Sequence, residues 1–290
     1  MGPQQTQYGI IGYPLGHTLS PAMQNAAFNF LEVDASYEVF ALPENKFDDF
    51  MMGLKREDNP IFGLNVTVPY KEDVLDYMDS LTPLAEKLRA VNTIFIGKKR
   101  NLIGHNTDAP GFLAHLSELN LETANKHVAI LGAGGSTRAI LGALCMIPER
   151  PRLITIYNRT YERLERLLGD LAKRLNLSIV QPVLSVEELQ IPKADILINT
   201  TSVGLSVDDP CLVPDEDIHP NLFVYDLIYN PAKTALLQTA EAKRAKYSNG
   251  LGMLFYQGVL AFQHWAETEI DGAVKEIMRK TLEESLQKTL

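Results

Sequence analysis

Apolar and polar positions along the chain follow two recurring patterns. Short, nearly continuous apolar runs are typical of strands buried in a parallel sheet, whereas apolar residues three or four positions apart are typical of helices. In the first third of the chain these patterns predict strands at 8–12, 37–42 and 64–68, helices at 21–31 and 45–54, and a helical stretch at 71–89 interrupted by Thr82-Pro83. Segments 92–96 and 102–103 flank a basic turn and are predicted to form a hairpin. Strands that alternate with helices predict a mainly parallel α/β domain.

The alternation restarts after a predicted helix at 111–119. It continues with strands at 128–131, 153–157, 179–183, 196–199 and 223–227 and helices at 138–146, 161–175 and 234–246. This second series predicts a doubly wound sheet, so we place one domain at 1–107 and a second at 108–249. A glycine-containing break at 249–252 precedes predicted helices at 253–265 and 273–286. Because a doubly wound domain is complete without these helices, we expect residues 250–290 to pack back on the first domain.

The charge and the cysteine content of the chain indicate which classes of partner and which cellular compartment to expect. The 290 residues include 27 Lys and Arg against 36 Asp and Glu, a formal charge of -9, which disfavours nucleic acid or an anionic membrane as the main partner. No apolar run approaches the length of a membrane span. Cys145, Cys211 and the six histidines lack metal-ligand spacing, so we predict no metal site and a reducing, cytoplasmic setting.

A glycine-rich turn separates the strand at 128–131 from the helix that follows it. The turn consists of Gly132, Ala133, Gly134 and Gly135. Such a turn presents bare backbone N–H groups and the positive end of a helix dipole at one point, which suits a bound pyrophosphate. The alternative is an ordinary tight connection, and Thr137 stands where a dinucleotide site usually has its third glycine.

The next predicted strand ends in Asn158, Arg159 and Thr160. In a site for NAD, an Asp or Glu at this strand end accepts from the ribose 2′-hydroxyl. A carboxylate would repel a 2′-phosphate, whereas Arg159, with Arg163 one turn into the next helix, would attract it. The strand end therefore predicts NADP as the cofactor. For Arg163 alone, the alternative is a solvated charge on the helix surface.

Two hydroxyls, those of Thr18 and Ser20, lie where the first strand gives way to a helix. Loops at the carboxyl ends of strands are where an open α/β sheet binds its ligand, so both hydroxyls are candidates for holding a hydroxylated substrate. The alternative for Ser20 is structural, because Ser followed by Pro is a common pair at the start of a helix.

Asn65 and Thr67 alternate with apolar residues on the third strand, share one face of it and lead to Lys71. The alternative is a half-solvated strand followed by a surface lysine. We expect Lys71 in the first turn of a helix, where the dipole disfavours an ammonium, although Glu72 and Asp73 favour it.

Three further polar residues are candidates for the site. Asp108 immediately precedes a predicted helix, and its alternative role is to cap that helix. Gln257 lies on an otherwise apolar helix and needs a partner if it is buried. Tyr229 follows the strand at 223–227, at the edge of the sheet where a nicotinamide would lie.

Many of these residues belong to seven motifs that follow one another over nearly the whole chain. The motifs are Gly16-His17-Thr18-Leu19-Ser20-Pro21, Asn65-Val66-Thr67-Val68-Pro69-Tyr70-Lys71, Val91-Asn92-Thr93, Gly104-His105-Asn106-Thr107-Asp108, Gly132-Ala133-Gly134-Gly135 with Arg138-Ala139, Asn158-Arg159-Thr160, and Gly250-Leu251-Gly252-Met253 with Gln257. In this order they resemble the shikimate dehydrogenase family. The resemblance implies a substrate domain followed by a Rossmann-like NADP domain, and the NADP-dependent, reversible reduction of 3-dehydroshikimate to shikimate in aromatic amino-acid biosynthesis.

The resemblance also implies roles for individual residues. Lys71 and Asp108 are expected to be the catalytic pair beside the substrate C3 oxygen. The residues expected around the substrate hydroxyls and carboxylate are Thr18, Ser20, Asn65, Thr67, Asn92, Tyr229 and Gln257. Those expected at the cofactor are Gly132, Ala133, Gly134, Gly135, Asn158, Arg159, Thr160 and Arg163 on the phosphate side and Leu227, Gly250 and Met253 on the nicotinamide side. We expect a monomer or a homodimer.

Two positions depart from the family pattern. Thr18 replaces the usual serine and adds a methyl group to the pocket, and Ala109 replaces a glycine. Thr18 leaves open a quinate/shikimate dehydrogenase that accepts either cofactor, although Arg159 argues against NAD. A second alternative is a regulator that binds NADP without catalysis, against which the presence of both Lys71 and Asp108 argues.

Overall fold

The structure is a computed structural model that describes residues 5–16, 18–206 and 208–288. The described residues form two compact units, one within Met1–Gly111 and Leu254–Thr289 and the other within Phe112–Met253. The divisions fall inside two continuous helices, α4 (Asp108–Glu118) and α8 (Leu251–Ala266), whereas the sequence placed them just before each helix. Within the described ranges, no helix is long and apolar enough to cross a membrane. His17, in the first motif, lies outside the described residues.

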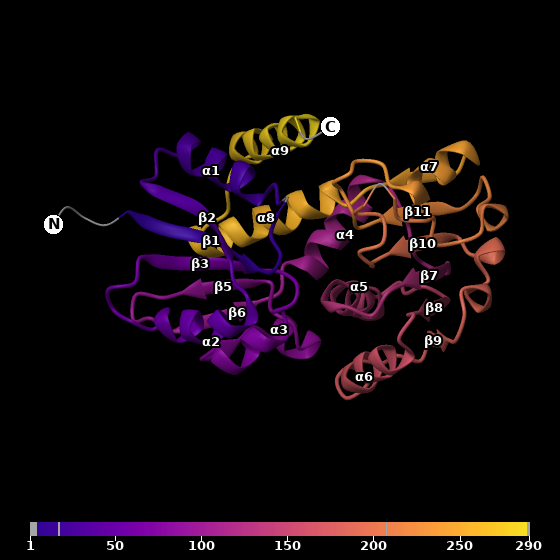
Figure 1. Cartoon of the computed structure of the whole chain (residues 1–290), viewed down its shortest axis with the longest axis horizontal. Helices are drawn as coiled ribbons and strands as arrows, with labels where there is room; N and C mark the ends of the chain where they lie inside the picture. The colour runs from indigo at the N-terminus through magenta and orange to yellow at the C-terminus, as the bar shows by residue number, and fades with distance from the viewer. Residues whose placement is uncertain (1–4, 17, 207, 289–290) are drawn as a thin grey trace. The chain divides into compact units, whose positions relative to one another are not determined.

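The first unit contains a mixed sheet of six strands in the order β2-β1-β3-β5-β6-β4 (Figure 1). The strands are β1 (Thr6–Gly12), β2 (Ala35–Ala41), β3 (Ile61–Val66), β4 (Ser80–Leu81), β5 (Thr93–Ile96) and β6 (Leu102–His105). Strands β2, β1 and β3 are parallel, and β5 and β6 form the predicted antiparallel hairpin beside β3. The register places Asn65 directly opposite Thr93, which is itself opposite His105. Side chains that are far apart in the sequence therefore share one face of the sheet.

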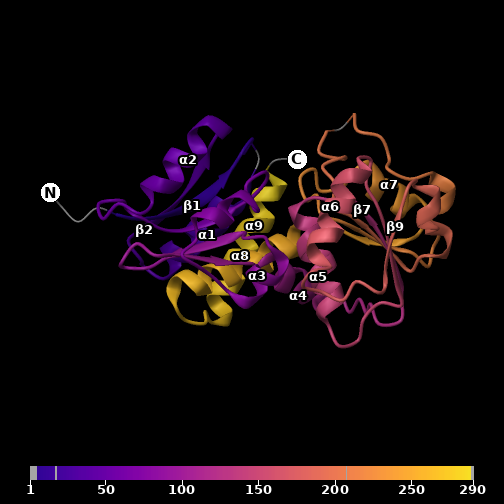
Figure 2. The same cartoon turned by 90° about the horizontal axis from the view of Figure 1, so that it is seen from below.

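Helices cover both faces of this sheet. They are α1 (Ser20–Phe30), α2 (Glu44–Gly53), α3 (Pro83–Leu88), α8 and α9 (Gly272–Gln287). Phe47 and Met51 of α2 share a buried core with Leu64 and Val66 of β3. Figure 2 shows α8 on the opposite side of the sheet from α2. Each face of the sheet therefore has its own apolar core.

The C-terminal helices pack back on the first unit, as predicted, with α8 on the sheet and α9 on α1. Trp265, the only tryptophan in the chain, donates from Nε1 to the carbonyl oxygen of Ile94 over 3.1 Å. Its ring lies against Gly63, where a Cβ atom would clash with the indole. Phe262 packs on Phe28 of α1 with ring centroids 5.0 Å apart. Glycine at position 63 therefore allows α8 to approach the sheet closely.

Asn25 of α1 closes part of the exposed edge of β2. Its Oδ1 accepts from the backbone N–H of Tyr37 over 2.8 Å, and its Nδ2 donates to the backbone oxygen of Tyr37 over 3.0 Å. The side-chain amide thus replaces a neighbouring strand at this residue. Asn25 therefore fixes both the backbone N–H and the backbone oxygen of Tyr37.

The second unit contains six parallel strands in the order β12-β11-β10-β7-β8-β9. The strands are β7 (His127–Leu131), β8 (Leu153–Tyr157), β9 (Val180–Val183), β10 (Ile196–Asn199), β11 (Phe223–Asp226) and β12 (Lys246–Ser248). Helices α5 (Gly135–Met146) and α6 (Tyr161–Leu171) lie on one face, and α7 (Ala235–Ala242) lies on the other (Figure 1). The order reverses between β7 and β10, so this is the predicted doubly wound sheet with its switch point at the glycine-rich turn.

Two predicted helices are wrong in part because strands form within the predicted ranges. Within 71–89 the chain forms a 3₁₀ helix at Asp73–Tyr77 and the short strand β4, and only then α3. The backbone N–H of Asp79 donates to Leu102, and the Asp79 carboxylate accepts from the N–H of Leu102, so pairing with β6 overrides the helical pattern. The predicted helix at 234–246 ends at Ala242 because Lys246–Ser248 pairs with β11.

Candidate functional site

Lys71 and Asp108 form a buried ion pair in the first unit. Lys71 Nζ lies 2.6 Å from Asp108 Oδ2, and the two residues are 8% and 6% exposed. Lys71 lies in a turn before the 3₁₀ helix, so its predicted place in the first turn of an α-helix is wrong. The close partner of the ammonium is the carboxylate of Asp108. Solvent is largely excluded, so the interaction between the two charges is stronger than it would be at the surface.

Asp108 begins α4, but its carboxylate does not cap the helix. Asn106 takes that role, because its Oδ1 accepts from the backbone N–H of Ala109 over 3.1 Å. The second carboxylate oxygen of Asp108, Oδ1, accepts from Nδ2 of Asn92 over 2.8 Å. The capping alternative for Asp108 is therefore wrong, and both of its oxygens contact other candidate site residues.

Asn92 lies at the centre of the cluster, immediately before β5. Its Nδ2 donates to Asp108, to Thr107 Oγ1 over 2.9 Å and, more weakly, to Gln257 Oε1 over 3.4 Å. Its Oδ1 accepts from the backbone N–H of Thr107 over 2.6 Å. Gln257, buried on α8, also donates from Nε2 to the carbonyl oxygen of Leu254 over 2.9 Å. The partner predicted for a buried glutamine is thus present.

Asn65 joins the cluster through a residue that the sequence did not single out. Its Nδ2 donates to Thr93 Oγ1 over 3.1 Å and to the carbonyl oxygen of Asn92 over 3.3 Å. The hydroxyls of Thr93 and Thr107 are 3.0 Å apart, and both threonines are fully buried. Thr93 and Thr107 are sequence neighbours of the candidate residues Asn92 and Asp108 in the motifs at 91–93 and 104–108. This position was the only indication in the sequence that they belong to the site.

Thr67 and Thr18 are both less buried than the residues of this cluster. Thr67 follows the end of β3, with its backbone N–H donating to Ile11 and its side chain partly exposed. Thr18 Oγ1 accepts from the backbone N–H of Ser20 over 3.3 Å. Ser20 and Pro21 are the first two residues of helix α1, as the structural alternative for Ser20 expects, although the N-cap itself is Leu19. Within the described ranges, no hydrogen bond joins Thr18 or Ser20 to the Lys71 cluster.

The glycine-rich turn has the backbone expected of an anion cradle. Gly132 has φ +113, and a Cβ atom there would clash with Thr200 Oγ1, so glycine is required. Gly134 has open space where a side chain would be. Helix α5 begins at Gly135, and its first backbone N–H groups have no partner within the helix. The turn therefore fits a phosphate group without a clash.

Thr137 stabilises this turn from the position where a dinucleotide site usually has its third glycine. Its hydroxyl accepts from the backbone N–H of Gly134 over 2.9 Å and lies 2.7 Å from Thr200 Oγ1. Thr200 Oγ1 in turn donates to the carbonyl oxygen of Leu131 at the end of β7 over 2.6 Å. The threonine hydroxyl thus ties the turn to the loop after β10.

Two exposed guanidinium groups follow β8, one in the turn after the strand and one on α6. Asn158 Nδ2 donates to the carbonyl oxygen of Thr160 over 2.7 Å and so fixes the turn into α6. Arg159 and Arg163 are exposed, and neither forms an ion pair with another described residue. Both cations are therefore available to a phosphate on a bound nucleotide.

The carboxyl end of β11 brings together two residues predicted at the nicotinamide side. A Cβ atom on Gly250 would clash with the carbonyl oxygen of Leu227, so only glycine allows this approach. Met253 is buried on α8, and Tyr229 is half-buried. Leu227, Tyr229, Gly250 and Met253 all belong to the second unit.

Asp226 is the most strongly perturbed carboxyl near this edge. It is fully buried, and burial raises its pKa to about 6, although hydrogen bonds from Thr234, from the Ile228 N–H and from Asn199 act in the opposite direction. Asn199 Nδ2 lies 2.9 Å from Asp226 Oδ1, and Asn199 Oδ1 accepts from the N–H of Thr201. The carboxyl thus anchors the loop after β10.

We expect Asp226→Asn to alter the pH dependence of stability. Because the pKa of Asp226 is raised from 3.8 to about 6, its neutral form favours folding, and this contribution is present below 3.8 and is lost as the pH rises through 6. Relative to Asp226→Asn, the wild type should lose up to about 3 kcal/mol of unfolding free energy between acidic and slightly alkaline pH. Urea unfolding followed by circular dichroism would measure this difference.

Asp209→Asn is a control of opposite sign in the same unit. Hydrogen bonds from the backbone N–H groups of Gly204 and Ser206 lower the pKa of Asp209, so its contribution is present at neutral pH and lost as the pH falls. An Asp226→Asn difference that stays constant with pH would show that Asp226 has the same pKa in the folded and unfolded states, which would contradict the raised pKa.

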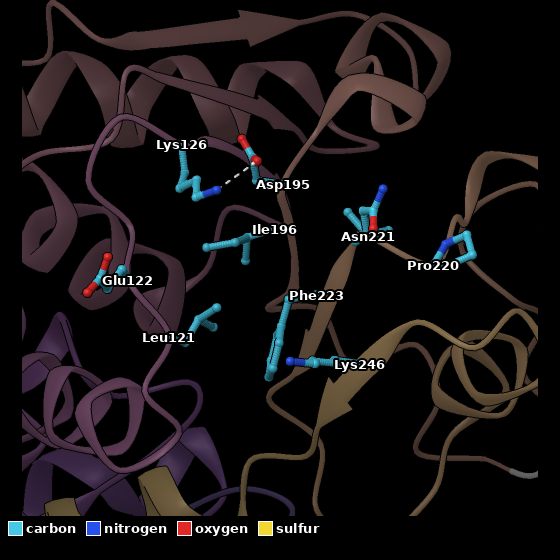
Figure 3. Close-up of a pocket in the computed structure, with 10 residues that line it drawn as sticks. Leu121, Glu122, Lys126, Asp195, Ile196, Pro220, Asn221, Phe223 and Lys246 are labelled. Carbon is cyan, nitrogen blue, oxygen red and sulfur yellow. Dashed lines mark hydrogen bonds and ion pairs between the residues drawn. The ribbon is translucent and has the colours of Figure 1, made fainter.

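A surface cavity of about 260 Å³ in the second unit lies away from these residues (Figure 3). It is lined by the first residues of three strands, Ile196, Phe223 and Lys246, and by the Lys126–Asp195 ion pair of 3.2 Å. The strands are parallel, so this cavity is at the edge opposite the glycine-rich turn. It is therefore no part of the candidate cofactor site. Within the described part of the chain, no group of three or more His, Cys, Asp or Glu side chains could hold a metal ion.

Comparisons with known proteins agree with this geometry. A family model described as "Shikimate dehydrogenase substrate binding domain" matches residues 10–94, and one described as "Shikimate / quinate 5-dehydrogenase" matches residues 115–209. A protein of Dictyoglomus turgidum named "Shikimate dehydrogenase (NADP(+))" is 40% identical over 91% of this chain and 93% of its own length.

Two solved structures are similar over almost the whole chain. The shikimate dehydrogenase of Aquifex aeolicus is 34% identical with a TM-score of 0.84, covering 96% of this chain and 98% of that one. The shikimate 5-dehydrogenase of Thermus thermophilus, solved with NADP(H) and shikimate, is 31% identical with a TM-score of 0.81, covering 98% and 100%.

Proposed function

Because the chain belongs to the shikimate dehydrogenase family, we propose that it catalyses the reversible, NADP-dependent reduction of 3-dehydroshikimate to shikimate. The observation that carries this proposal is the buried Lys71–Asp108 ion pair of 2.6 Å. Lys71 and Asn92 both fall within the segment that matches the substrate-binding domain. A regulator without catalysis would have no need of a buried charged pair in a substrate site, since burying charges is costly.

The residue types suit the chemistry of a carbonyl reduction. NADPH, when bound, supplies the hydride that reaches the carbonyl carbon. The carbonyl oxygen becomes an alkoxide, and the Lys71 ammonium would stabilise its charge and transfer a proton from Nζ to it. Asp108 would hold the ammonium in place and accept from a neighbouring substrate hydroxyl. In the oxidative direction, Lys71 would accept the proton of the C3 hydroxyl.

The first unit is proposed to bind the substrate. Asn92 and Gln257 contact each other beside Asp108, which supports their place near the reacting oxygen. The proposed substrate residues of this unit are Thr18, Ser20, Asn65, Thr67, Asn92 and Gln257, and Tyr229 is a further candidate on the second unit. Their hydroxyl and amide groups match a ring that carries several hydroxyls and one carboxylate.

The second unit is proposed to bind NADP. The open glycine-rich turn at the start of α5 supports a role for Gly132 to Gly135 at the pyrophosphate. The exposed cations at the end of β8 support a role at the 2′-phosphate for Asn158, Arg159, Thr160 and Arg163. Leu227, Gly250 and Met253 are proposed to lie at the nicotinamide.

We also propose that the enzyme works in the cytoplasm as a monomer or a homodimer. Cys145 and Cys211 are free thiols, which fits a reducing compartment. Size-exclusion chromatography with light scattering would distinguish the two assembly states.

An assay of shikimate and quinate, each with NADP and NAD, tests the activity. We expect shikimate with NADP to give the highest kcat/KM and quinate to react much more slowly with either cofactor. Failure to oxidise shikimate with NADP would overturn the proposed function. Comparable quinate turnover with NAD would overturn both the substrate and the cofactor choice. A Thr18→Ser variant would then show whether the additional methyl group affects the ratio of shikimate to quinate turnover.

A further inference from the structure

Tyr37 contacts the proposed substrate site from a position that the motifs do not include. It lies on β2 and is 2% exposed. Its hydroxyl is 2.7 Å from Oδ1 of Asn65, which is itself 4% exposed. A hydrogen bond of this length between two buried side chains fixes both groups.

The direction of this hydrogen bond follows from the other contacts of Asn65. One neighbour of its amide is the backbone oxygen of Asn92, which can only accept, so Nδ2 must face Asn92 and Thr93. Oδ1 therefore faces Tyr37, and the phenol must donate. Both N–H groups of Asn65 are then used within the protein. What remains for a substrate is the second lone pair of Oδ1, an acceptor.

The phenol is held in place by the surrounding protein. Asn25 binds the backbone of Tyr37 at both N–H and oxygen. The ring of Tyr37 lies 5.9 Å from the ring of Trp265, in the core beneath α8. A donor on so fixed a ring gives Asn65 little freedom to turn.

We propose that Tyr37 is a positioning residue for substrate binding, which fixes the Asn65 amide so that Oδ1 accepts from a substrate hydroxyl. This inference rests on the proposed function, because that function places Asn65 in the substrate site. Without the phenol, Oδ1 has no donor among the described residues, and the amide is held only by the 3.1 and 3.3 Å contacts of Nδ2. A substrate hydroxyl then meets a less ordered acceptor, so binding weakens while the Lys71–Asp108 pair remains intact.

Tyr37→Phe tests the proposal, since it removes one hydroxyl and keeps the ring. We expect the KM for shikimate to rise about 10-fold, with kcat and the KM for NADP within about 2-fold of the wild type. Fluorescence of Trp265 and the thermal unfolding curve would show that the first unit remains folded. Tyr8→Phe is the matched control, because the Tyr8 ring lies 5.2 Å from Trp265 in the same aromatic cluster, whereas the hydroxyl that bonds to Asn65 is that of Tyr37.

A double-mutant cycle with Asn65→Ala separates positioning from a general packing role. If Tyr37 acts through Asn65, Tyr37→Phe has no further effect on the KM for shikimate once Asn65 is alanine. Effects that multiply, an equal rise in Tyr8→Phe, or a loss in kcat at unchanged KM would each overturn the proposal. An inactive wild type would overturn the proposed function as well, whereas an active wild type with an unchanged Tyr37→Phe would overturn this inference alone.

Discussion

Lys71→Ala is expected to lower kcat for shikimate oxidation by ~10²–10⁴-fold, the range that a positioned acid or base contributes. The methyl group of alanine can neither exchange a proton with the C3 oxygen nor stabilise its negative charge. The KM for NADP should stay within a few-fold of the wild type, because Lys71 lies in the unit proposed to bind the substrate. Steady-state kinetics with shikimate and NADP would measure both quantities.

The substitution leaves Asp108 buried without its cation, so the fold must be checked separately. Trp265, the only tryptophan, is buried in the same unit and its fluorescence reports on that unit. Lys55→Ala is a matched control, because Lys55 forms an ion pair of 2.8 Å with Asp79 outside the cluster. The side chains of both residues in this pair are about half exposed. We expect Lys55→Ala to keep full activity. A folded Lys71→Ala enzyme with kcat within a few-fold of the wild type would contradict the proposed role.

The four central strands of the second unit, β7, β8, β10 and β11, could be predicted closely because their apolar runs are largely buried. The predicted strands at 153–157 and 196–199 coincide with β8 and β10. Every residue of β10 is buried, so the sequence of this strand is constrained along its whole length. The doubly wound architecture also followed from the alternation of strands and helices, since such connections are right-handed.

The errors occurred where strand pairing overrides local preference. Lys246–Ser248 carries no strong strand signal, yet it pairs with β11, and Arg244 adopts a positive φ of 60° where α7 ends. The segment before α3 also forms a strand in place of a helix, because Asp79 is hydrogen-bonded to Leu102, which lies in a later part of the chain. Contacts of this kind depend on tertiary structure and leave no periodic signal in a single sequence.

The candidate site was predictable only in part, for the same reason. Lys71, Asn92, Asp108 and Gln257 could be named because they belong to motifs, and the structure places them within one hydrogen-bonded cluster. Tyr37 could not be named, because its role depends on how β2 and β3 lie on either side of β1 and on the amide direction of Asn65. The sequence pattern shows only a strand residue at that position.

Arg159→Ala is expected to raise the KM for NADP about 100-fold while changing the KM for NAD less than about 2-fold. A guanidinium can form two charge-assisted hydrogen bonds with a phosphate, each stronger than a neutral hydrogen bond. Arg159 is exposed and forms no ion pair with the other described residues, so its charge is not neutralised before a nucleotide binds. NAD lacks the 2′-phosphate and therefore gains nothing from this cation.

The salt dependence of NADP binding provides an independent measurement of the same contact. Screening weakens exposed charge pairs, so the KM for NADP should rise with salt in the wild type and rise less steeply in Arg159→Ala. Arg166→Ala is the matched control, because Arg166 is an exposed arginine on α6 that already donates to the carbonyl oxygen of Glu162. If Arg159→Ala and Arg166→Ala change the NADP kinetics equally, the discrimination between the cofactors does not depend on Arg159, and Arg163 becomes the residue to replace next.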